Sequence, residues 1–242
     1  MYEPRTYRHW IEGKELVSCN VTVKETDLYI RASSNLKRKA HRLVLKYRRQ
    51  LEDYIERHPV FLTSLEPVLI DEDAPQIVRQ MAEAAQMAGV GPMAAVAGAI
   101  AEFVGNELLA FSPEIIVENG GDIYLKSLRK RIVGIYAGKS PISGKVGLEI
   151  NGEDTPIGIC TSSGTVGHSL SFGQADAVIV VAKSASLADA SATAIGNLIN
   201  QPADITNGIG LAKSIKGLEG VVIIKDEHIG IWGKVKICQT SE

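Results

Sequence analysis

Aromatic residues are scarce in this chain of 242 residues: it has two Trp, seven Tyr and four Phe, or 5% of the sequence. Net charge is also small, at −2, with a sequence pI of about 6.2. This charge balance argues against a dedicated nucleic-acid-binding protein, which needs a basic surface for the phosphate backbone. Intrinsic disorder is excluded, because 45% of the residues are hydrophobic and the length allows a sizeable core.

The chain also lacks the signals of an exported or membrane-spanning protein. Its three cysteines, Cys19, Cys160 and Cys238, are widely spaced and form no metal-binding pattern. The N-terminal residues are charged and contain no apolar signal core. One uncharged run, residues 84–101, is mostly Ala and Gly and is interrupted by glycines and a proline, so we expect no membrane span. These features predict a cytoplasmic protein with reduced cysteines.

The first third of the chain predicts strands followed by a long helix. Residues 5–32 alternate apolar and polar positions between turn signals, which indicates a β-meander. Apolar residues then recur at helical spacing from Leu36 to His58, with possible capping residues just before, and Pro59 ends the pattern. This helix carries eight Lys or Arg against three Asp or Glu, so its charge of +5 leaves −7 for the rest. We interpret it as a solvated basic face, and a phosphate-facing surface is the alternative.

The remainder predicts small-residue helices and a sheet. One helix should run from about Asp73 to Gly89, and a second from Gly91-Pro92 to about Leu109. Ten Ala and four Gly lie between residues 81 and 110, so these helices can approach a sheet or a ligand closely. The further predicted strands are 114–118, 123–125, 132–137, 146–150, 157–160 and 177–182, then helices 187–199 and 204–215 and a hairpin of 221–224 with 229–237. This order indicates an α+β fold with a largely antiparallel sheet in a single domain.

Two glycine-containing segments are candidate phosphate sites. Gly89 to Met93 opens an Ala-rich helix, and amides at a helix start attract anions; close helix packing is the alternative. Asn119, Gly120, Gly121 and Asp122 follow an apolar strand. There the two glycines allow the backbone to approach a ligand, or they form an ordinary hairpin turn.

Two further segments offer polar side chains. Residues 161–168 concentrate hydroxyl groups and end at His168, as phosphate or oxyanion recognition requires; Ser162, Ser163 and Gly164 lie at their centre. In a later helix of small residues, Asp189 and Thr193 are four positions apart and share one face. A carboxylate and a hydroxyl there suit a hard cation such as Mg²⁺, and a first-turn helix cap is the alternative.

A serine hydrolase is a separate hypothesis for the same loop. Ser163, His168 and Asp176 supply the three residue types of a nucleophilic triad. The G-x-S-x-G turn that exposes such a serine in one large hydrolase class is absent.

Taken together in chain order, these segments resemble the ApbE family, the FAD:protein FMN transferases. Residues 119–122 (Asn-Gly-Gly-Asp) look like that family's N-x-G-G-D turn. Residues 162–164 (Ser-Ser-Gly) lie where the family has a T-S-G motif, and His168 falls near its downstream histidine. Residues 188–194 resemble the A-D-x-x-x-T-A metal motif, whose Asp and Thr bind Mg²⁺ beside the flavin pyrophosphate. The match covers about residues 89–200, and the N-terminal third looks like an uncharacterised ApbE-related family.

The resemblance implies one ApbE-like domain over residues 1–242, with a strand-and-helix region at 1–60 and the core at 75–242. It implies Mg²⁺ held by Asp189 and Thr193, phosphate contacts from Asn119, Gly120, Gly121 and residues 162–164, and His168 or Asp122 as general acid or base. The ligand is then FAD, FMN or another phosphorylated nucleotide, and the reaction a transfer or cleavage at a pyrophosphate.

The chain departs from the family pattern at two positions. Ala97 stands where ApbE proteins usually carry a lysine, and Ser169-Leu170 replaces the D-P after the histidine. These departures keep a second function class open, a catalytically inactive binding or assembly module. Expected partners are a small phosphorylated ligand, an acceptor protein if transfer occurs, and a second copy in a homodimer. The few aromatics leave Tyr124 as the best candidate to contact a flavin ring, and the Gly and Ala segments favour phosphate recognition.

Overall fold

The structure is a computed structural model that describes residues 11, 13, 15–165 and 171–240. Within these residues the strands are β1 (Val17–Val23), β2 (Thr26–Ala32), β3 (Ile115–Asn119), β4 (Asp122–Lys126), β5 (Arg131–Gly134), β6 (Val146–Ile150), β7 (Ile157–Ser162), β8 (Ala177–Ala182), β9 (Leu218–Lys225), β10 (His228–Gly233) and β11 (Lys236–Gln239). The helices are α1 (Lys37–Arg57), α2 (Val60–Thr63), α3 (Gln76–Ala88), α4 (Val96–Leu108), α5 (Ala185–Gly196) and α6 (Ile205–Ser214), with 3₁₀ turns at Pro92–Ala95, Gly152–Asp154 and Pro202–Asp204.

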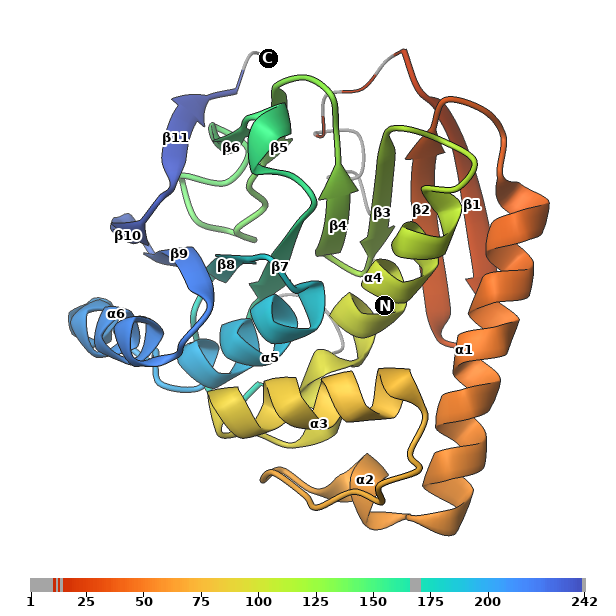
Figure 1. Cartoon of the computed structure of the whole chain (residues 1–242). Helices are drawn as coiled ribbons and strands as arrows, with labels where there is room; N and C mark the ends of the chain where they lie inside the picture. The colour runs from red at the N-terminus through yellow and green to blue at the C-terminus, as the bar shows by residue number, and fades with distance from the viewer. Residues whose placement is uncertain (1–10, 12, 14, 166–170, 241–242) are drawn as a thin grey trace.

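One eight-stranded sheet organises the molecule, in the order β1-β2-β3-β4-β7-β8-β9-β10, with every neighbouring pair antiparallel. Helices α3, α4 and α5 cover one face, and α1 stands along the side near β1 (Figure 1). The three-stranded sheet β11-β6-β5 packs over part of the opposite face. The predicted α+β class with a largely antiparallel sheet in one domain is therefore confirmed.

The central strands are buried on both sides because each face of the large sheet has its own core. Along β8, Val178 and Val180 pack with the helices, whereas Ile179 and Val181 pack with the small sheet. This explains why the sequence of β8 is a continuous apolar run instead of an alternating one. The predicted strand 177–182 matches β8 at both ends.

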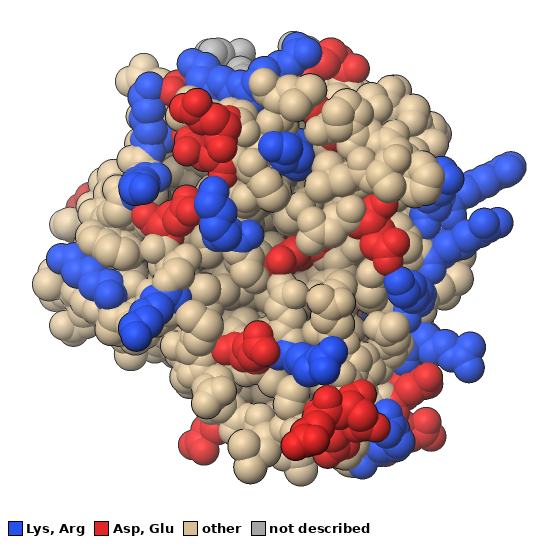
Figure 2. Space-filling model, in the orientation of Figure 1, with Lys and Arg blue, Asp and Glu red and all other residues tan. Residues whose placement is uncertain are grey.

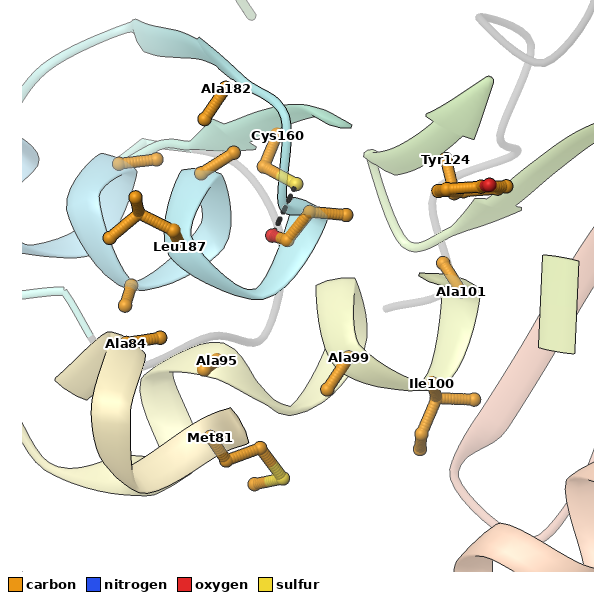
Figure 3. Packing of buried hydrophobic residues seen from close by; sticks show 14 of the residues in the cluster. Met81, Ala84, Ala95, Ala99, Ile100, Ala101, Tyr124, Cys160, Ala182 and Leu187 are labelled. Carbon is orange, nitrogen blue, oxygen red and sulfur yellow. Dashed lines mark hydrogen bonds between the residues drawn. The ribbon is translucent and has the colours of Figure 1, made fainter. Parts of the chain in front are cut away.

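Small residues let the helices approach one another and the sheet closely. A Cβ on Gly98 of α4 would lie 2.3 Å from the Ala185 carbonyl oxygen of α5. A Cβ on Gly158 of β7 would lie 2.3 Å from the Ala185 Cα. Residues 98 and 158 therefore have no room for a side chain, because the Ala185 backbone lies directly against both. Figure 3 shows this packing, with Ala95 of the 3₁₀ turn and Ala99 and Ala101 of α4 among the small buried side chains.

The helix boundaries follow the sequence signals with small shifts. The predicted end at Gly89 is confirmed, since Gly89 caps α3 in the left-handed region with φ of +73°. The second helix begins as a 3₁₀ turn at Pro92 before becoming α4. No single described helix is long and apolar enough to cross a membrane; α3 and the segment from Pro92 to Leu108 pass such a test only together, bent by 106°.

Two predicted strand segments differ from the structure. The C-terminal strand expected over 229–237 is two strands: β10 pairs with β9, and β11 crosses to β6 in the other sheet. Gly233, with φ of +89°, lies at the break. Within the predicted β-meander, the structure describes the hairpin of β1 and β2. The predicted residues 5–10 lie outside the described residues.

Candidate functional site

A single peptide unit of α4 joins the two predicted site segments. The Ala97 carbonyl accepts a hydrogen bond from Asn119 Nδ2 at 3.1 Å, and the Gly98 N–H donates to Asp189 Oδ2 at 2.9 Å. Asn119 ends β3 and Asp189 lies on α5, so residues 70 positions apart meet at the first turn of α4. The close approach at Gly98 allows this contact, because a Cβ there would lie 2.9 Å from the Asp189 Cβ.

Two carboxyl groups come together beside this junction. Asp122, the first residue of β4, is 6% exposed, and its Oδ1 accepts a hydrogen bond from the Thr161 N–H of β7 at 3.2 Å. Burial, and next the negative charge of Asp189, raises the pKa of Asp122 well above its usual range. Burial raises the pKa of Asp189 to about 7, while backbone hydrogen bonds from Gly98 and Ala97 oppose the rise. The two groups are therefore an acidic pair in which each carboxyl holds its proton more strongly than an exposed aspartate does.

Cys160 lies in the same buried space. Its Sγ donates to the Ala185 carbonyl oxygen at 3.3 Å, the contact drawn as a dashed line in Figure 3. Burial, followed by the charges of Asp122 and Asp189, raises the pKa of the Cys160 thiol well above its usual value. A thiol in this environment stays protonated and is a poor nucleophile. The expected reduced cysteine is thus part of the wall of the acidic pair.

The Gly120-Gly121 turn is a hairpin connection with an open outer side. Both glycines have positive φ, +70° and +110°, which a two-residue hairpin turn between antiparallel strands requires. A Cβ on Gly120 would meet nothing within 4 Å, so a ligand has room there. The Gly121 N–H already donates to Glu118 Oε1 at 2.8 Å. A phosphate at this amide would have to displace the Glu118 carboxylate.

The predicted segment 162–164 lies at the end of β7, and two of its residues have structural contacts of their own. Ser162 packs against α5, with its Oγ 3.3 Å from the position of a Cβ on Gly196. The Gly164 N–H donates to the Ala175 carbonyl oxygen at 2.9 Å, and a Cβ on Gly164 would lie 2.0 Å from the Gly173 carbonyl oxygen. This glycine is needed for a close passage of two backbone segments, and its amide is already hydrogen-bonded.

The hydrolase hypothesis receives no support from the residues around Asp176. The Asp176 carboxylate accepts from the Asp226 N–H at 2.6 Å and from Thr165 Oγ1 at 3.3 Å, so it fixes two loops. Ser163 Oγ is 3.4 Å from Thr165 Oγ1. The third member of that triad, His168, lies outside the described residues. Its predicted role as general acid or base therefore stays a prediction.

The oxygen ligands expected for Mg²⁺ are present in part. Thr193 lies one helical turn after Asp189 on α5 and is partly exposed, which places its hydroxyl on the same helix face. No Lys or Arg of the described chain forms an ion pair with Asp122 or Asp189. The described residues hold no group of three or more His, Cys, Asp and Glu that could bind a metal ion alone. Two carboxylates and a hydroxyl nevertheless fit Mg²⁺, which keeps several waters and binds phosphate oxygens.

Tyr124 is not available to a flavin ring, contrary to the expectation from the sequence. Its side chain is 2% exposed and its hydroxyl donates to Asn106 Oδ1. A Cβ on Gly105 would lie 2.3 Å from the Tyr124 Cδ1, so the ring fills the space that this glycine leaves on α4 (Figure 3). Several of the Gly and Ala residues attributed to phosphate recognition likewise serve close packing.

Sequence reasoning assigned no site role to four contributors: Ala97 and Gly98 of α4, Glu118 of β3, and Glu102 of α4. The Glu102 Oε2 accepts hydrogen bonds from the Ala185 N–H at 2.7 Å and the Ser186 N–H at 3.2 Å, so it caps the first turn of α5. The one available signal was a carboxylate between the apolar residues Ala101 and Phe103. Ala97 acts through its backbone, for which a side-chain pattern gives no warning.

Comparison with known proteins places this geometry in a family. A family model described as "AbpE bacteria" matches residues 8–213. A UPF0280 protein of Methanocaldococcus jannaschii is 46% identical over 221 residues, covering 89% of this chain and 90% of the relative. A UPF0280 protein of Methanopyrus kandleri is 42% identical over 226 residues, covering 90% and 91%.

Solved structures share the fold at low sequence identity. The apo flavinyl transferase ApbE of Pseudomonas stutzeri superposes with a TM-score of 0.60 at 15% identity, covering 90% of this chain and 93% of that chain. The flavin transferase ApbE of Vibrio cholerae gives 0.59 at 13% identity, covering 90% and 96%. The fold of this chain is therefore that of the ApbE proteins.

Proposed function

The chain belongs to the ApbE-related family of UPF0280 proteins, and we propose that it binds a flavin nucleotide, or another nucleotide with a pyrophosphate, together with Mg²⁺. The observation that carries the proposal is a pair of carboxyl groups beside the Gly120-Gly121 turn: Asp122 is buried and Asp189 is partly buried, and neither has an ion-pair partner among the described residues. Two neighbouring acidic groups whose pKa values are both raised are costly to ionise unless a cation or protons balance them. The ApbE fold supports the flavin as ligand.

The residues divide into two roles in this proposal. Asp189 and Thr193 hold the metal ion, which neutralises phosphate charge and makes the pyrophosphate easier to cleave when it is bound. Gly98 orients the Asp189 carboxylate through its N–H, and the Ala97 carbonyl keeps Asn119 at the turn. The phosphates lie over the open side of Gly120, with Asn119, Gly121 and residues 162–164 around them.

Proton transfer is assigned to Asp122 or His168. The pKa of Asp122 is raised well above its usual range, which suits Asp122 to supply a proton to a departing phosphate oxygen. Its hydrogen bond from Thr161 fixes the orientation of the carboxyl group. His168 stays the alternative proton donor or acceptor. Transfer to an acceptor protein, a homodimeric state and a cytoplasmic location stay predictions from the sequence.

The proposal is tested by ligand binding with and without the metal ion. Thermal unfolding is recorded with FAD, FMN and ADP at 1 mM, each with 5 mM MgCl₂ or EDTA, at about pH 8, where the Asp189 carboxyl is ionised. We expect FAD with Mg²⁺ to raise the melting temperature by several degrees, and Asp189→Asn to remove the magnesium-dependent part. Asp53→Asn, an exposed aspartate on α1, is the control and should leave the shift unchanged. No shift with any nucleotide would contradict the proposal.

Release of AMP from FAD separates an enzyme from a binding module. Cleavage of the pyrophosphate gives equal amounts of AMP and a flavin mononucleotide product, which chromatography resolves. The inactive module is favoured by one observation: Ala97 supplies only a backbone carbonyl where ApbE proteins usually carry a lysine side chain. Magnesium-dependent binding without AMP, in the presence and absence of candidate acceptor proteins, would assign the chain to that class.

A further inference from the structure

The first two turns of α1 carry an exposed cluster of basic side chains. Figure 2 shows Lys and Arg side chains projecting from the edge where α1 lies in Figure 1. The exposed basic residues of these turns are Lys37, Arg38, Lys39, His41 and Arg42. None of them forms an ion pair with any residue that the structure describes.

Further along the same helix, several cations have acidic partners. Lys46 Nζ lies 2.6 Å from Glu107 Oε1 on α4. Arg48 contacts Glu25 at 2.6 Å and Glu52 at 2.9 Å. Lys46 and Arg48, which face other elements, are thus paired with acidic residues, whereas the group at the N-terminal end has no acidic partner among the described residues.

The position of this cluster works against the stability of the helix. A helix N-terminus carries a partial positive charge, which favours Asp and Glu and disfavours Lys and Arg. The first turn of α1 contains no acidic residue, and the Leu36 cap position provides no side-chain hydrogen bond. Solubility alone would be served equally well by acidic residues, which would also stabilise the helix. An anion supplied from outside the chain gives these cations a role.

An exposed aromatic ring lies within the cluster. Phe111, at the end of α4, is 51% exposed, and Lys39 Nζ lies 3.7 Å from the centre of its ring. The ring comes from a segment far along the sequence, so the basic residues of α1 and an apolar contact form one surface only in the folded protein. We call Lys37, Arg38, Lys39, Arg42 and Phe111 the α1 basic face.

We propose that the α1 basic face docks a short acidic segment of a partner protein that also carries an aromatic or aliphatic side chain. Residues 37–42 span about 9 Å of helix, which matches roughly three extended residues at about 3.3 Å each. Phe111 provides an apolar contact in addition to the charges. A long polyanion is a poorer match, because the rest of the chain carries an excess of negative charge that would repel its flanking phosphates.

The test uses a defined probe and two matched triple variants. The probe is a fluorescein-labelled ten-residue peptide with five Asp or Glu around one Phe, and binding is followed by anisotropy at 50 and 150 mM NaCl. The first variant is Arg38→Glu, Lys39→Glu and Arg42→Glu. The control is Lys213→Glu, Lys216→Glu and Lys234→Glu, which changes the net charge equally at exposed positions elsewhere. We expect the α1 variant to weaken binding at least tenfold and the control to weaken it less than twofold. Phe111→Ala should weaken binding severalfold without changing its salt dependence.

Stability gives a second readout that does not depend on the peptide. If the cations are placed for a partner at a cost to the helix, the α1 triple variant should melt at a higher temperature than the wild type while binding less peptide. Equal loss of binding in both triple variants would overturn the proposal, as would peptide binding no stronger than that of a neutral peptide. Tighter binding to a ten-nucleotide single-stranded RNA, or to vesicles of 70% phosphatidylcholine and 30% phosphatidylglycerol, would overturn the choice of a protein partner. None of these measurements requires flavin or Mg²⁺.

Discussion

Helices α1 and α5 place their charges in opposite ways. On α1 the exposed face is basic and open to solvent, and the apolar residues form one stripe against the strands and α4. On α5 nearly every residue is small and buried, and its one carboxylate, Asp189, lies against the backbone of α4. Charge on α1 can be changed with little effect on packing, whereas on α5 packing and charge depend on the same contacts. Substitutions on α1 should therefore change binding without a loss of stability, whereas substitutions at α5 should change both.

The strongest test of that coupling is Gly98→Ala on α4. The new Cβ would lie 2.3 Å from the Ala185 carbonyl oxygen, so α4 and α5 must separate. We expect a loss of about 3 kcal/mol in the free energy of unfolding, measured with urea, and loss of magnesium-dependent nucleotide binding. Gly210→Ala on α6 is the control, because nothing lies within 4 Å of its Cβ position. It should be neutral or up to about 1 kcal/mol stabilising. Similar losses in both variants would refute the packing argument.

Asp189→Asn should change the free energy of unfolding, and the raised pKa of Asp189 sets the sign of the change. Between about pH 4 and pH 7 the folded protein keeps a proton on Asp189 that the unfolded chain has released, so stability falls as pH rises through this window. Above pH 7 Asp189 is ionised in the folded protein, so its full destabilising effect on folding is present. In EDTA, the Asn variant should be more stable than the wild type by about 4 kcal/mol at pH 8 and nearly equal to it at pH 4. Urea unfolding at both values checks this, and a greater gain at pH 4 would reverse the assignment.

The fold was predictable where one element carried its own signal. Strand β8 reads as an apolar run in the sequence, and α3 ends at a glycine that takes a left-handed conformation. The prediction of a single strand over 229–237 was wrong, because this segment alternates like one strand although Gly233 interrupts it. Nothing local says that β11 pairs with β6, since that choice depends on which strand edge is free in three dimensions.

The candidate site was predictable only through its side chains. Asp122 and Asp189 stand out as carboxylates in apolar surroundings, and the structure brings them together. The peptide unit that connects their segments belongs to Ala97 and Gly98, which have no functional groups in their side chains. Tyr124 shows the opposite error: its place beside the Gly-Gly turn suggested ligand contact, but Gly105 opposite it makes a pocket for the ring inside the core.

Glu102→Ala should weaken α5 by a smaller amount than the change at Gly98. The Glu102 carboxylate accepts hydrogen bonds from the Ala185 and Ser186 N–H groups, and its removal leaves both donors without that partner. We expect a loss of about 1–2 kcal/mol in the free energy of unfolding. Glu102→Gln keeps an acceptor oxygen and should lose less than half of that. If the Gln variant is as unstable as the Ala variant, the negative charge matters more than the hydrogen bonds.

The smallest expected effect lies on α1, where two charge reversals at opposite ends should have opposite signs. Arg38→Glu puts a negative charge in the first turn, near the positive end of the helix, and should stabilise the protein by about 0.5 kcal/mol. Arg57→Glu removes a cation from the last turn, where its Nε donates to the Asp53 carbonyl oxygen at 3.2 Å, and should destabilise by a similar amount. Both changes alter the net charge equally, so overall charge repulsion cannot produce stability changes of opposite sign.

Urea unfolding at 50 mM and 500 mM NaCl should show that the stability difference between the two variants shrinks with salt. Two shifts of the same sign would mean that the α1 cations carry no cost for the helix, and the argument for an external anion would lose its basis.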